Sequence, residues 1–394
     1  MEKLVTLSKT KSAAVTSGFE RFLIQDIDWR ERFILVAGPR GAGKTTLLLQ
    51  QMNRAQKKAI YLSLDDIYFE ANRLIVAMDA LYKEGYRVYY LDEVHRYRHW
   101  SKDLKNAYDN YPDIQLVVTG SSILELSKGQ GDLSRRAAVY KLPGLSFREF
   151  LHLHHGLNQK SVTLEDVLTS HQSLAAEITD QVQVSKTFRE YLRFGYYPYF
   201  REGIRAYPQK LREAVYLVLE VDIAQYEDLN TVTVRNMKKL MYVISRSVPF
   251  KPNISRLSEK LDIPRNSILR ILDLLDRAGV LVLLRSDTQG ISYLQKPDKI
   301  YLNNPNLIYL FSDNRPAAGS LRETFFLNQV QVRHNVTASR FADFMADHTW
   351  TFEVGGPSKS GEEIRGLPGA YIAADEIEEG SGNRIPLWLF GFLY

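Results

Sequence analysis

The sequence contains no cysteine, so disulfide bonds, thiolate zinc sites and a cysteine nucleophile are all excluded. It also has no uninterrupted apolar stretch near the roughly 20 residues that a membrane-spanning helix needs. The first residues, MEKLVTLSKTKSAAV, lack the apolar core of a secretory signal. We therefore expect a cytoplasmic protein without a membrane partner.

The rest of the composition is ordinary for a folded protein, with 45% apolar and 25% charged residues. A length of 394 residues leaves room for two or three domains. The formal net charge of +5 permits a nucleic-acid partner without requiring one. His95 and His99 have the spacing of two metal ligands on a helix, but no glutamate follows His95, so a packed or solvated role is expected.

The strongest motif is a glycine-rich segment that follows a short apolar run. Residues 33–36 (FILV) suit a buried parallel strand, and residues 38–45 fit G-x-x-x-x-G-K-[ST]. The glycines let backbone N–H groups point at phosphate oxygens, and the helix after them adds partial positive charge. The residues expected to bind ATP are Gly38, Pro39, Arg40, Gly41, Ala42, Gly43, Lys44, Thr45 and Thr46.

The chemistry of this loop assigns separate tasks to two of its side chains. Lys44 is expected to reach the terminal phosphates and to act in catalysis. Thr45 is expected to offer its hydroxyl to Mg²⁺. A chance match to a glycine-rich turn is the alternative, which the flanking strand and helix disfavour.

The next elements alternate as a parallel sheet requires. Strands are predicted over 59–64, 87–91, 114–118 and 137–142, and helices over 69–83 and 100–108. Five strands with helices between them predict a three-layer α/β domain with a P-loop parallel sheet. Ligands of such sheets bind at the carboxyl ends of the strands.

Those strand ends carry further candidates. Asp92 follows the apolar run 88–91 and is predicted to hold Mg²⁺ directly or through water. Glu93 comes next and is our candidate general base, because a carboxylate there can polarise the attacking water. Thr119 and Ser121 end the neighbouring strand, where one of them contacts the γ-phosphate or the water, or else caps a turn.

Two arginines, Arg135 and Arg136, lie just before the fifth strand. A guanidinium suits the charge of a phosphoryl group in transfer, so either could reach the γ-phosphate of the same or a neighbouring subunit. A solvated basic turn is the alternative. Asp28-Trp29-Arg30, before the first strand, is a candidate contact to the base, although a packing role is favoured.

Several segments together resemble a prokaryotic AAA-type ATPase family in which a C-terminal domain of unknown function follows the ATPase. The segments are GPRGAGKTTLL, YYLDEVHRYRHW, LVVTGSS, RRAAVYKLPGLSFREFL, YLRFGYYPYF, PDKIYLNNPNLIYL, LRETFFLNQV and IPLWLFGFLY. The resemblance covers nearly the whole chain and implies an ATP-binding fold of the additional-strand, catalytic-glutamate type. It implies no physiological role.

Residues 146–235 are rich in helical patterns and are expected to form a helical lid. Residues 236–296 predict a winged helix-turn-helix, with helices over 254–261 and 266–278 and a hairpin of 280–284 with 291–294. The second helix of such a fold enters the major groove, so the candidate contacts to duplex DNA are Arg265, Asn266, Ser267 and Arg270. A protein-interaction module is the alternative.

Residues 297–394 read as a mixed α/β domain. Glu323 in a helix, Asp343 and then Glu353 in a strand are similar to restriction-type nucleases, whose carboxylates bind Mg²⁺. Gly355 stands where the lysine of a Glu-x-Lys motif should be, and a Gly-Gly-Pro-Ser loop separates Lys359 from the strand. We therefore expect a nuclease-like fold without strong nuclease activity, or carboxylates with a structural role.

The combined prediction is a P-loop ATPase domain over 1–145, a helical lid over 146–235, a winged helix over 236–296 and an inactive nuclease-like domain over 297–394. ATP hydrolysis with Mg²⁺, giving ADP, would drive or regulate a partner, either a protein or duplex DNA. An oligomer is compatible with this prediction. The alternatives are a non-hydrolysing nucleotide switch and a DNA-processing effector with an active C-terminal nuclease.

Overall fold

The computed structural model describes residues 1–394 except 16–17, 121–134, 224–230, 247, 287–295 and 313–315. The described residues fall into two compact units, Met1–Gly144 and Leu145–Tyr394. The lid, winged-helix and C-terminal segments expected from the sequence therefore lie within one compact unit. Among the described residues, no helix combines the length and the apolar composition needed to cross a membrane.

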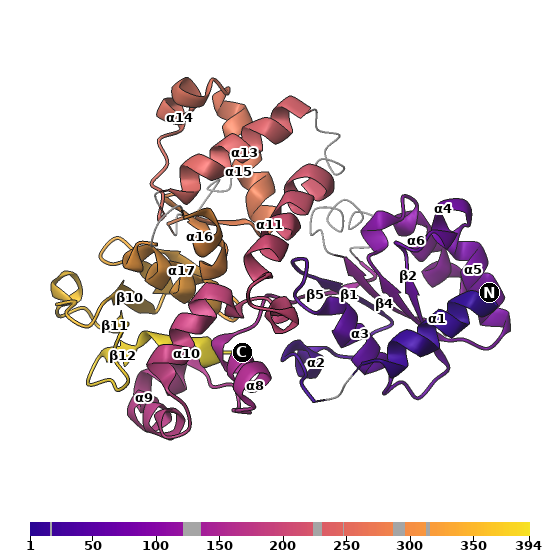
Figure 1. Cartoon of the computed structure of the whole chain (residues 1–394), viewed down its shortest axis with the longest axis horizontal. Coiled ribbons are helices and arrows are strands. Elements are labelled where there is room, and N and C mark those ends of the chain that lie inside the picture. Colours follow the sequence, from indigo (N-terminus) through magenta and orange to yellow (C-terminus); the bar gives the residue numbers. More distant parts are fainter. Residues whose placement is uncertain (16–17, 121–134, 224–230, 247, 287–295, 313–315) are drawn as a thin grey trace. The chain divides into compact units, whose positions relative to one another are not determined.

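The first unit is built on a five-stranded parallel sheet in the order β2-β3-β4-β1-β5 (Figure 1). Its strands are β1 (Phe33–Ala37), β2 (Ala59–Ser63), β3 (Val88–Asp92), β4 (Gln115–Gly120) and β5 (Ala138–Lys141). Its helices are α1 (Glu2–Ala13), α2 (Leu23–Asp26), α3 (Lys44–Met52), α4 (Tyr68–Ala71), α5 (Leu74–Lys83) and α6 (Trp100–Asn110), with the 3₁₀ turn η1 (Val94–Arg96) after β3.

The alternation of side chains along the strands explains why helices cover both faces of this sheet. Phe33 and Leu35 of β1 pack with the buried side chains of α5 and α6 on one face. Ile34 and Val36 pack with those of α2 and α3 on the other. Since every residue of β1 and β3 is buried, these strands read as continuous apolar runs rather than as alternating ones.

One helix differs from its prediction. The segment predicted as a helix over 69–83 is two helices, α4 and α5, with extended backbone at Asn72 and Arg73 between them. The new helix start is stabilised from elsewhere in the chain, because the Tyr97 hydroxyl accepts from Leu74 N–H at 3.3 Å and Asp103 accepts from Ile75 N–H at 3.4 Å. Asp103 is fully buried and also pairs with Arg73.

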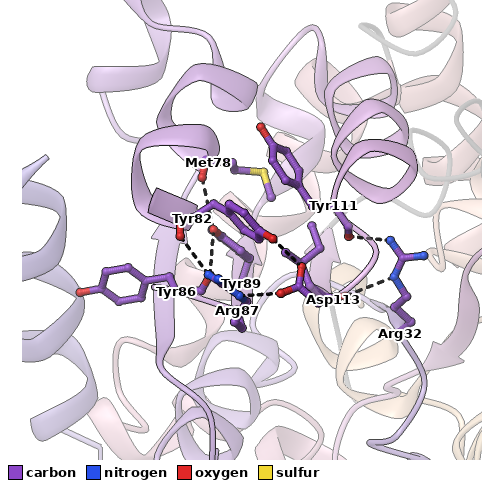
Figure 2. A network of polar contacts seen from close by, with 9 residues as sticks. Arg32, Met78, Tyr82, Tyr86, Arg87, Tyr89, Tyr111 and Asp113 are labelled. Carbon is purple, nitrogen blue, oxygen red and sulfur yellow. Dashed lines mark hydrogen bonds and ion pairs between the residues drawn. The ribbon is translucent and has the colours of Figure 1, made fainter. Parts of the chain in front are cut away.

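Tyrosines and arginines join the helices near the amino ends of β3 and β4 (Figure 2). Asp113 accepts a hydrogen bond from the Tyr82 hydroxyl at 2.9 Å and another from Arg87 at 2.7 Å. These contacts, the Tyr82 hydrogen bond first, lower the pKa of the Asp113 carboxyl. Arg32 donates to the carbonyl of Tyr111 at 2.8 Å. The network fixes the end of the sheet opposite to the glycine-rich loop.

The second unit begins with helices and ends with a mixed sheet. Its helices are α8 (Phe147–His155), α9 (Leu164–Thr179), α10 (Val184–Glu190), α11 (Tyr207–Leu217), α13 (Thr231–Ser245), α14 (Ile254–Leu261), α15 (Arg265–Arg277), α16 (Pro305–Phe311) and α17 (Ala318–Val330). Shorter helical turns are η2 (Tyr191–Gly195), η3 (Pro198–Glu202), η4 (Val218–Asp222), η6 (Glu362–Ile364) and η7 (Leu387–Phe392). The aromatic segment 195–200 is packed, since Tyr196, Tyr197 and Phe200 are all buried.

Its five-stranded sheet has the order β12-β11-β10-β9-β8. The strands are β8 (Val336–Ala338), β9 (Phe344–Ala346), β10 (Trp350–Gly355), β11 (Ala370–Ala374) and β12 (Arg384–Pro386). β8, β9 and β10 pair antiparallel, whereas β10, β11 and β12 pair parallel. This architecture is mixed α/β, as predicted for the end of the chain.

The hairpin after α15 has a different second strand from the predicted one. β6 (Leu281–Leu284) pairs antiparallel with β7 (Lys299–Leu302), and the predicted strand 291–294 lies outside the described residues. A domain boundary between 296 and 297 would separate these paired strands, so that boundary is wrong. β7 joins the hairpin to the C-terminal part of the unit, because α16 and α17 follow it directly.

Candidate functional site

The glycine-rich loop connects β1 to α3, as its sequence predicts. Gly41 and Gly43 have φ angles of 77° and 95°, in the left-handed region that favours glycine. Gly38 is required for a different reason. A Cβ atom on Gly38 would lie 2.2 Å from the carbonyl oxygen of Leu142, so the chain after β5 leaves room for glycine alone.

Lys44 begins α3, and the residue is 4% exposed. Its ammonium donates to the carbonyl oxygens of Gly38 at 2.8 Å and Pro39 at 2.9 Å. The side chain therefore folds back over the loop rather than into solvent. Phosphate oxygens are stronger acceptors for an ammonium than neutral carbonyls are, so this position suits phosphate binding.

Asp92 at the end of β3 is the centre of a hydroxyl cluster. Its carboxylate accepts hydrogen bonds from Thr45 at 2.7 Å, from Tyr61 at 2.7 Å and from Thr119. The residue is 2% exposed, so hydroxyl groups rather than water satisfy its oxygens. The structure thus brings Thr45, Asp92 and Thr119 together, as the strand-end rule predicts.

The same cluster tests whether Mg²⁺ fits here. Mg²⁺ prefers oxygen ligands and is commonly held by one or two carboxylates together with substrate phosphates and water. Thr45 and Asp92 present a hydroxyl and a carboxylate side by side, next to the loop expected to bind phosphate. The donor set therefore fits Mg²⁺.

The sequence analysis did not single out Tyr61. Burial, followed by the charge of Asp92, raises the pKa of the Tyr61 hydroxyl, so it stays protonated and remains a donor to Asp92. The signal was a hydroxyl-bearing side chain within a strand that is otherwise apolar. The register of the strands places Tyr61 of β2 opposite Tyr90 of β3, two residues before Asp92. Only this register brings the Tyr61 hydroxyl near Asp92.

Glu93 follows in an unusual backbone conformation. Its φ angle is 52°, which costs a non-glycine residue about 1–3 kcal/mol and is common at functional sites. Its N–H donates to the Thr119 hydroxyl at 3.4 Å, and its carboxylate lies 3.4 Å from the buried imidazole of His95. His99 precedes α6 whereas His95 lies in η1, so the two histidines do not share a helix.

Arg135 and Arg136 do not lie at this end of the sheet. Both precede β5, which runs parallel to β1, so they are at the opposite end of the strands from the phosphate loop. Arg136 pairs there with Asp109 at 3.1 Å, and Arg135 is exposed in the same turn. The prediction that either arginine reaches the γ-phosphate of its own subunit is therefore wrong.

The segment that flanks the phosphate loop is also earlier in the chain than predicted. Arg21 is buried and donates to the carbonyls of Ala42, of Pro143 at 2.9 Å and of Gly144 at 2.8 Å. Trp29 lies next to the start of β1, where its indole donates to the Ile24 carbonyl at 2.8 Å. Trp29 therefore has the packing role, whereas the side chain of Arg30 is 90% exposed and pairs with Asp28. Arg21 was missed.

The residues predicted to contact DNA lie at the start of α15. Arg265, Asn266 and Arg270 are exposed and Ser267 is half-buried. The opposite side of the helix is buried through Ile268, Ile271, Leu272, Leu274 and Leu275. The helix therefore presents the four candidates away from its apolar side.

Three carboxylates of the second unit, which the sequence groups as similar to those of restriction-type nucleases, lie close to one another. Glu323 comes from α17, Asp343 directly precedes β9, and Glu353 lies in β10. Asp343 accepts from the Val354 N–H at 3.1 Å. The charge of Asp343 also raises the pKa of both glutamates, after burial as the main cause.

Lys359 reaches this cluster despite the loop that separates it from β10. A Cβ atom on Gly355 would lie 2.8 Å from Cβ and Cγ of Lys359, so the lysine stem runs over the glycine. The ammonium of Lys359 pairs with Glu353. The loop between β10 and Lys359 therefore does not keep the lysine away from the strand, because Lys359 occupies the space beside Gly355.

Comparisons with known proteins agree with the architecture of the first unit. Residues 30–151 match an AAA domain family, and residues 185–317 match a family described as a domain of unknown function, DUF8612. The uncharacterized protein MJ1637 of Methanocaldococcus jannaschii is 28% identical over 271 residues, which cover 64% of this chain and 56% of that protein. The chain thus spans little more than half of that relative.

Among solved structures, the Walker-type ATPase PABY2304 of Pyrococcus abyssi is similar at 13% identity, covering 74% of this chain and 95% of that one, with a TM-score of 0.45. The Holliday junction branch migration motor RuvB of Thermotoga maritima is similar at 19% identity, covering 71% and 89%, with a TM-score of 0.32. The AAA domain match and the parallel sheet with its phosphate loop support an AAA-type ATPase domain that binds ATP.

Proposed function

We propose that this protein hydrolyses ATP with Mg²⁺ and uses the cycle to drive or regulate a partner, either a protein or duplex DNA. The observation that carries the proposal is the meeting of Thr45, Asp92, Thr119 and Glu93 beside the phosphate loop. The parallel strands bring these four residues from three segments to one end of the sheet, where ligands of such sheets bind. This arrangement supplies the groups that phosphoryl transfer to water requires.

Each residue has a task that follows from its position. The loop N–H groups and Lys44 bind the phosphates, and Mg²⁺ when bound supplies positive charge to the phosphate oxygens. Asp92 and Thr45 hold that ion. Glu93 accepts a proton from the attacking water, and Thr119, which touches both Asp92 and the Glu93 backbone, fixes their spacing.

An arginine at the γ-phosphate can also be supplied by another subunit. Arg135 and Arg136 lie at the far end of their own sheet, so we propose that one of them acts across an interface in an oligomer. Each is changed to alanine, and turnover is measured across a range of protein concentrations. If neither variant loses turnover, the cross-subunit role is wrong.

Steady-state ATP hydrolysis by the purified protein tests the main proposal. Glu93→Gln should lower turnover by about 10²–10⁴-fold while ATP binding persists. Glu70→Gln, an exposed glutamate of α4, is the matched control and should retain turnover. If the native protein binds ATP but does not turn it over, the protein is a nucleotide switch instead.

For the partner, we propose that α14, α15, β6 and β7 act as a winged helix-turn-helix on duplex DNA. The exposed amino end of α15, with Arg265 and Arg270, supports this reading. Each change to alanine should reduce the slope of log affinity against log salt by about one. Arg277→Ala, at the other end of α15, should leave the slope unchanged. Turnover indifferent to DNA would favour a protein partner.

A second candidate is a DNA-processing effector that cleaves DNA through its C-terminal domain. The convergence of Glu323, Asp343 and Glu353 with the ammonium of Lys359 favours it, because carboxylates and a lysine are what metal-dependent hydrolysis of DNA needs. We expect little cleavage by the native chain, since lysines already balance much of this charge. Mg²⁺-dependent cleavage that disappears in Glu353→Ala would establish the activity.

A further inference from the structure

The hairpin strand β7 sends two side chains into the carboxylate cluster of the second unit. Lys299 and Tyr301 are two residues apart on the strand, so they lie on the same face. The Lys299 ammonium lies 3.0 Å from Asp343 and 3.5 Å from Glu323. The Tyr301 hydroxyl donates to Glu323 at 2.6 Å. The strand therefore contributes a cation and a neutral donor to two of the carboxylates.

Burial makes this contact electrostatically strong. The side chains of Lys299, Glu323 and Asp343 are 17%, 15% and 18% exposed, so water screens them little. The ammonium of Lys299 is within ion-pair distance of both acids and acts as their internal counter-ion.

Among the residues that the structure describes, the ion pairs of the cluster do not balance its charge. Three carboxylates pair there with two ammonium groups, those of Lys299 and Lys359. Glu353 has a side chain that is 3% exposed, and among the described residues its Oε2 atom has no hydrogen-bond partner. An unpaired buried carboxylate oxygen is costly unless a cation satisfies it. Oxygen ligands of this kind suit a divalent ion such as Mg²⁺ or Mn²⁺.

We propose that Glu323, Asp343 and Glu353 form a divalent-cation site that Lys299 occupies as a competing internal cation. Lys299 and the ion compete because both need the same oxygens of Asp343 and Glu323. The ion therefore binds well only when Lys299 leaves. The competing cation is carried by β7, the strand that pairs with β6 in the hairpin.

This inference concerns the location used by the second candidate function, but it needs neither DNA cleavage nor ATP hydrolysis. Its test is Mn²⁺ binding to the full chain without nucleotide, by isothermal titration calorimetry and by thermal unfolding with and without Mn²⁺. Any Mn²⁺ bound at the phosphate loop contributes equally to every variant. If the Lys299 variants gain no Mn²⁺ affinity, the ATPase proposal is unaffected. If the protein does not hydrolyse ATP, this inference is unaffected.

Lys299→Met keeps the apolar stem and removes the charge, so it should lower the Mn²⁺ dissociation constant by at least about tenfold. Mn²⁺ should also raise its unfolding temperature more than that of the native chain. Lys296→Met, an exposed lysine before β7, is the matched control and should show no gain. Adding Glu353→Gln to Lys299→Met should abolish the gain.

Two further variants keep the proposal falsifiable if Lys299→Met does not fold. Lys299→Gln removes the charge but keeps a donor for Asp343, and should gain Mn²⁺ affinity. Lys299→Arg keeps the charge and should not. The proposal is overturned if Lys299→Met and Lys299→Gln fold but bind Mn²⁺ no more tightly than the native chain. It is also overturned if Lys299→Arg gains as much Mn²⁺ affinity as those two variants.

Discussion

Two buried carboxylate sites of this molecule are stabilised in different ways. Asp92 in the first unit is held by three hydroxyl groups, from Thr45, Tyr61 and Thr119. Glu323, Asp343 and Glu353 in the second unit are held chiefly by the ammonium groups of Lys299 and Lys359. Hydroxyl donors satisfy oxygen atoms but bring no positive charge, whereas ammonium groups offset part of the negative charge.

The difference indicates how ready each site is for a metal ion. Asp92 lies at the carboxyl end of β3, where the groups that hold it are neutral hydroxyls, so an arriving cation meets no competing cation among them. In the second unit an arriving cation must displace lysines first. The Asp92 carboxylate is surrounded by neutral donors, whereas the carboxylates of the second unit are already paired with cations.

The largest expected effect comes from removing the negative charge of Asp92. Asp92→Asn keeps the shape of the side chain and an oxygen acceptor for the hydroxyls, but the cation loses its carboxylate. Mg²⁺-dependent ATP turnover should fall by at least about 100-fold. Turnover is followed across a Mg²⁺ titration. A variant that regains native turnover at native Mg²⁺ concentrations would show that the charge of Asp92 is not needed.

The next effect concerns stability at the lysine-held site. Lys359→Met leaves the buried Glu353 without its ammonium partner, which should cost about 2 kcal/mol at pH 7, less than for a fully buried pair because Lys359 is 35% exposed. Burial, and then the charge of Asp343, raise the pKa of Glu353 against the contact with Lys359.

The raised pKa of Glu353 makes the stability of the protein depend on pH. A carboxyl whose pKa is higher in the folded protein than its ordinary 4.5 stabilises the fold at a pH below 4.5, and this stabilisation is lost as the pH rises through the pKa of the folded state. The free energy of unfolding that Lys359→Met loses relative to the native chain should therefore be larger at pH 7 than near pH 4.5. Urea unfolding at both pH values measures it, with Lys296→Met as the control. An equal deficit at both would show that the lysine acts through packing rather than charge.

A smaller effect is expected from the hydroxyl that orients Asp92. Tyr61→Phe removes a 2.7 Å hydrogen bond and little volume, and should weaken Mg²⁺-dependent nucleotide binding by about tenfold. The measurement is the Mg²⁺ dependence of binding of a fluorescent ATP analogue. Tyr89→Phe, in β3 with its hydroxyl on the Met78 carbonyl at 3.2 Å, controls for loss of a buried hydroxyl. Equal effects of the two changes would place Tyr61 outside the metal site.

The smallest effect concerns an ion pair that lies outside both clusters. Arg136 and Asp109 are partly exposed, so Arg136→Ala should change the free energy of unfolding by less than about 1 kcal/mol. Thermal unfolding checks this directly. A stability loss well above that would mean that any loss of turnover in this variant reflects damage to the fold.

The sequence predicts the first unit well because its signals are local. A continuous apolar run, a glycine-rich turn and an acidic strand end each specify their own neighbourhood, so the loop and Asp92 follow from residues close in the chain. The break between α4 and α5 could not be predicted this way. Its cap comes from Tyr97 and Asp103, more than 20 residues further on.

The lysine-held cluster shows the same limit. The spacing of Glu353 and Gly355 indicates a missing lysine, but only the path of the loop places Lys359 beside the glycine. Lys299 gave no sequence signal at all, because it reaches Asp343 and Glu323 from a hairpin strand. The misplacement of Arg136 had another cause, since the parallel direction of β5 already puts its first residues at the far end of the sheet.

Arg21 gives the first unit a mechanical property. One planar guanidinium holds a carbonyl of the phosphate loop, at Ala42, together with those of Pro143 and Gly144, where the chain leaves the unit. Because the N–H groups of a guanidinium have fixed directions, one side chain sets the positions of the loop carbonyl and the two exit carbonyls relative to one another. The loop is thus tied to the last residues of its own unit by a side chain, independently of the hydrogen bonds of the sheet.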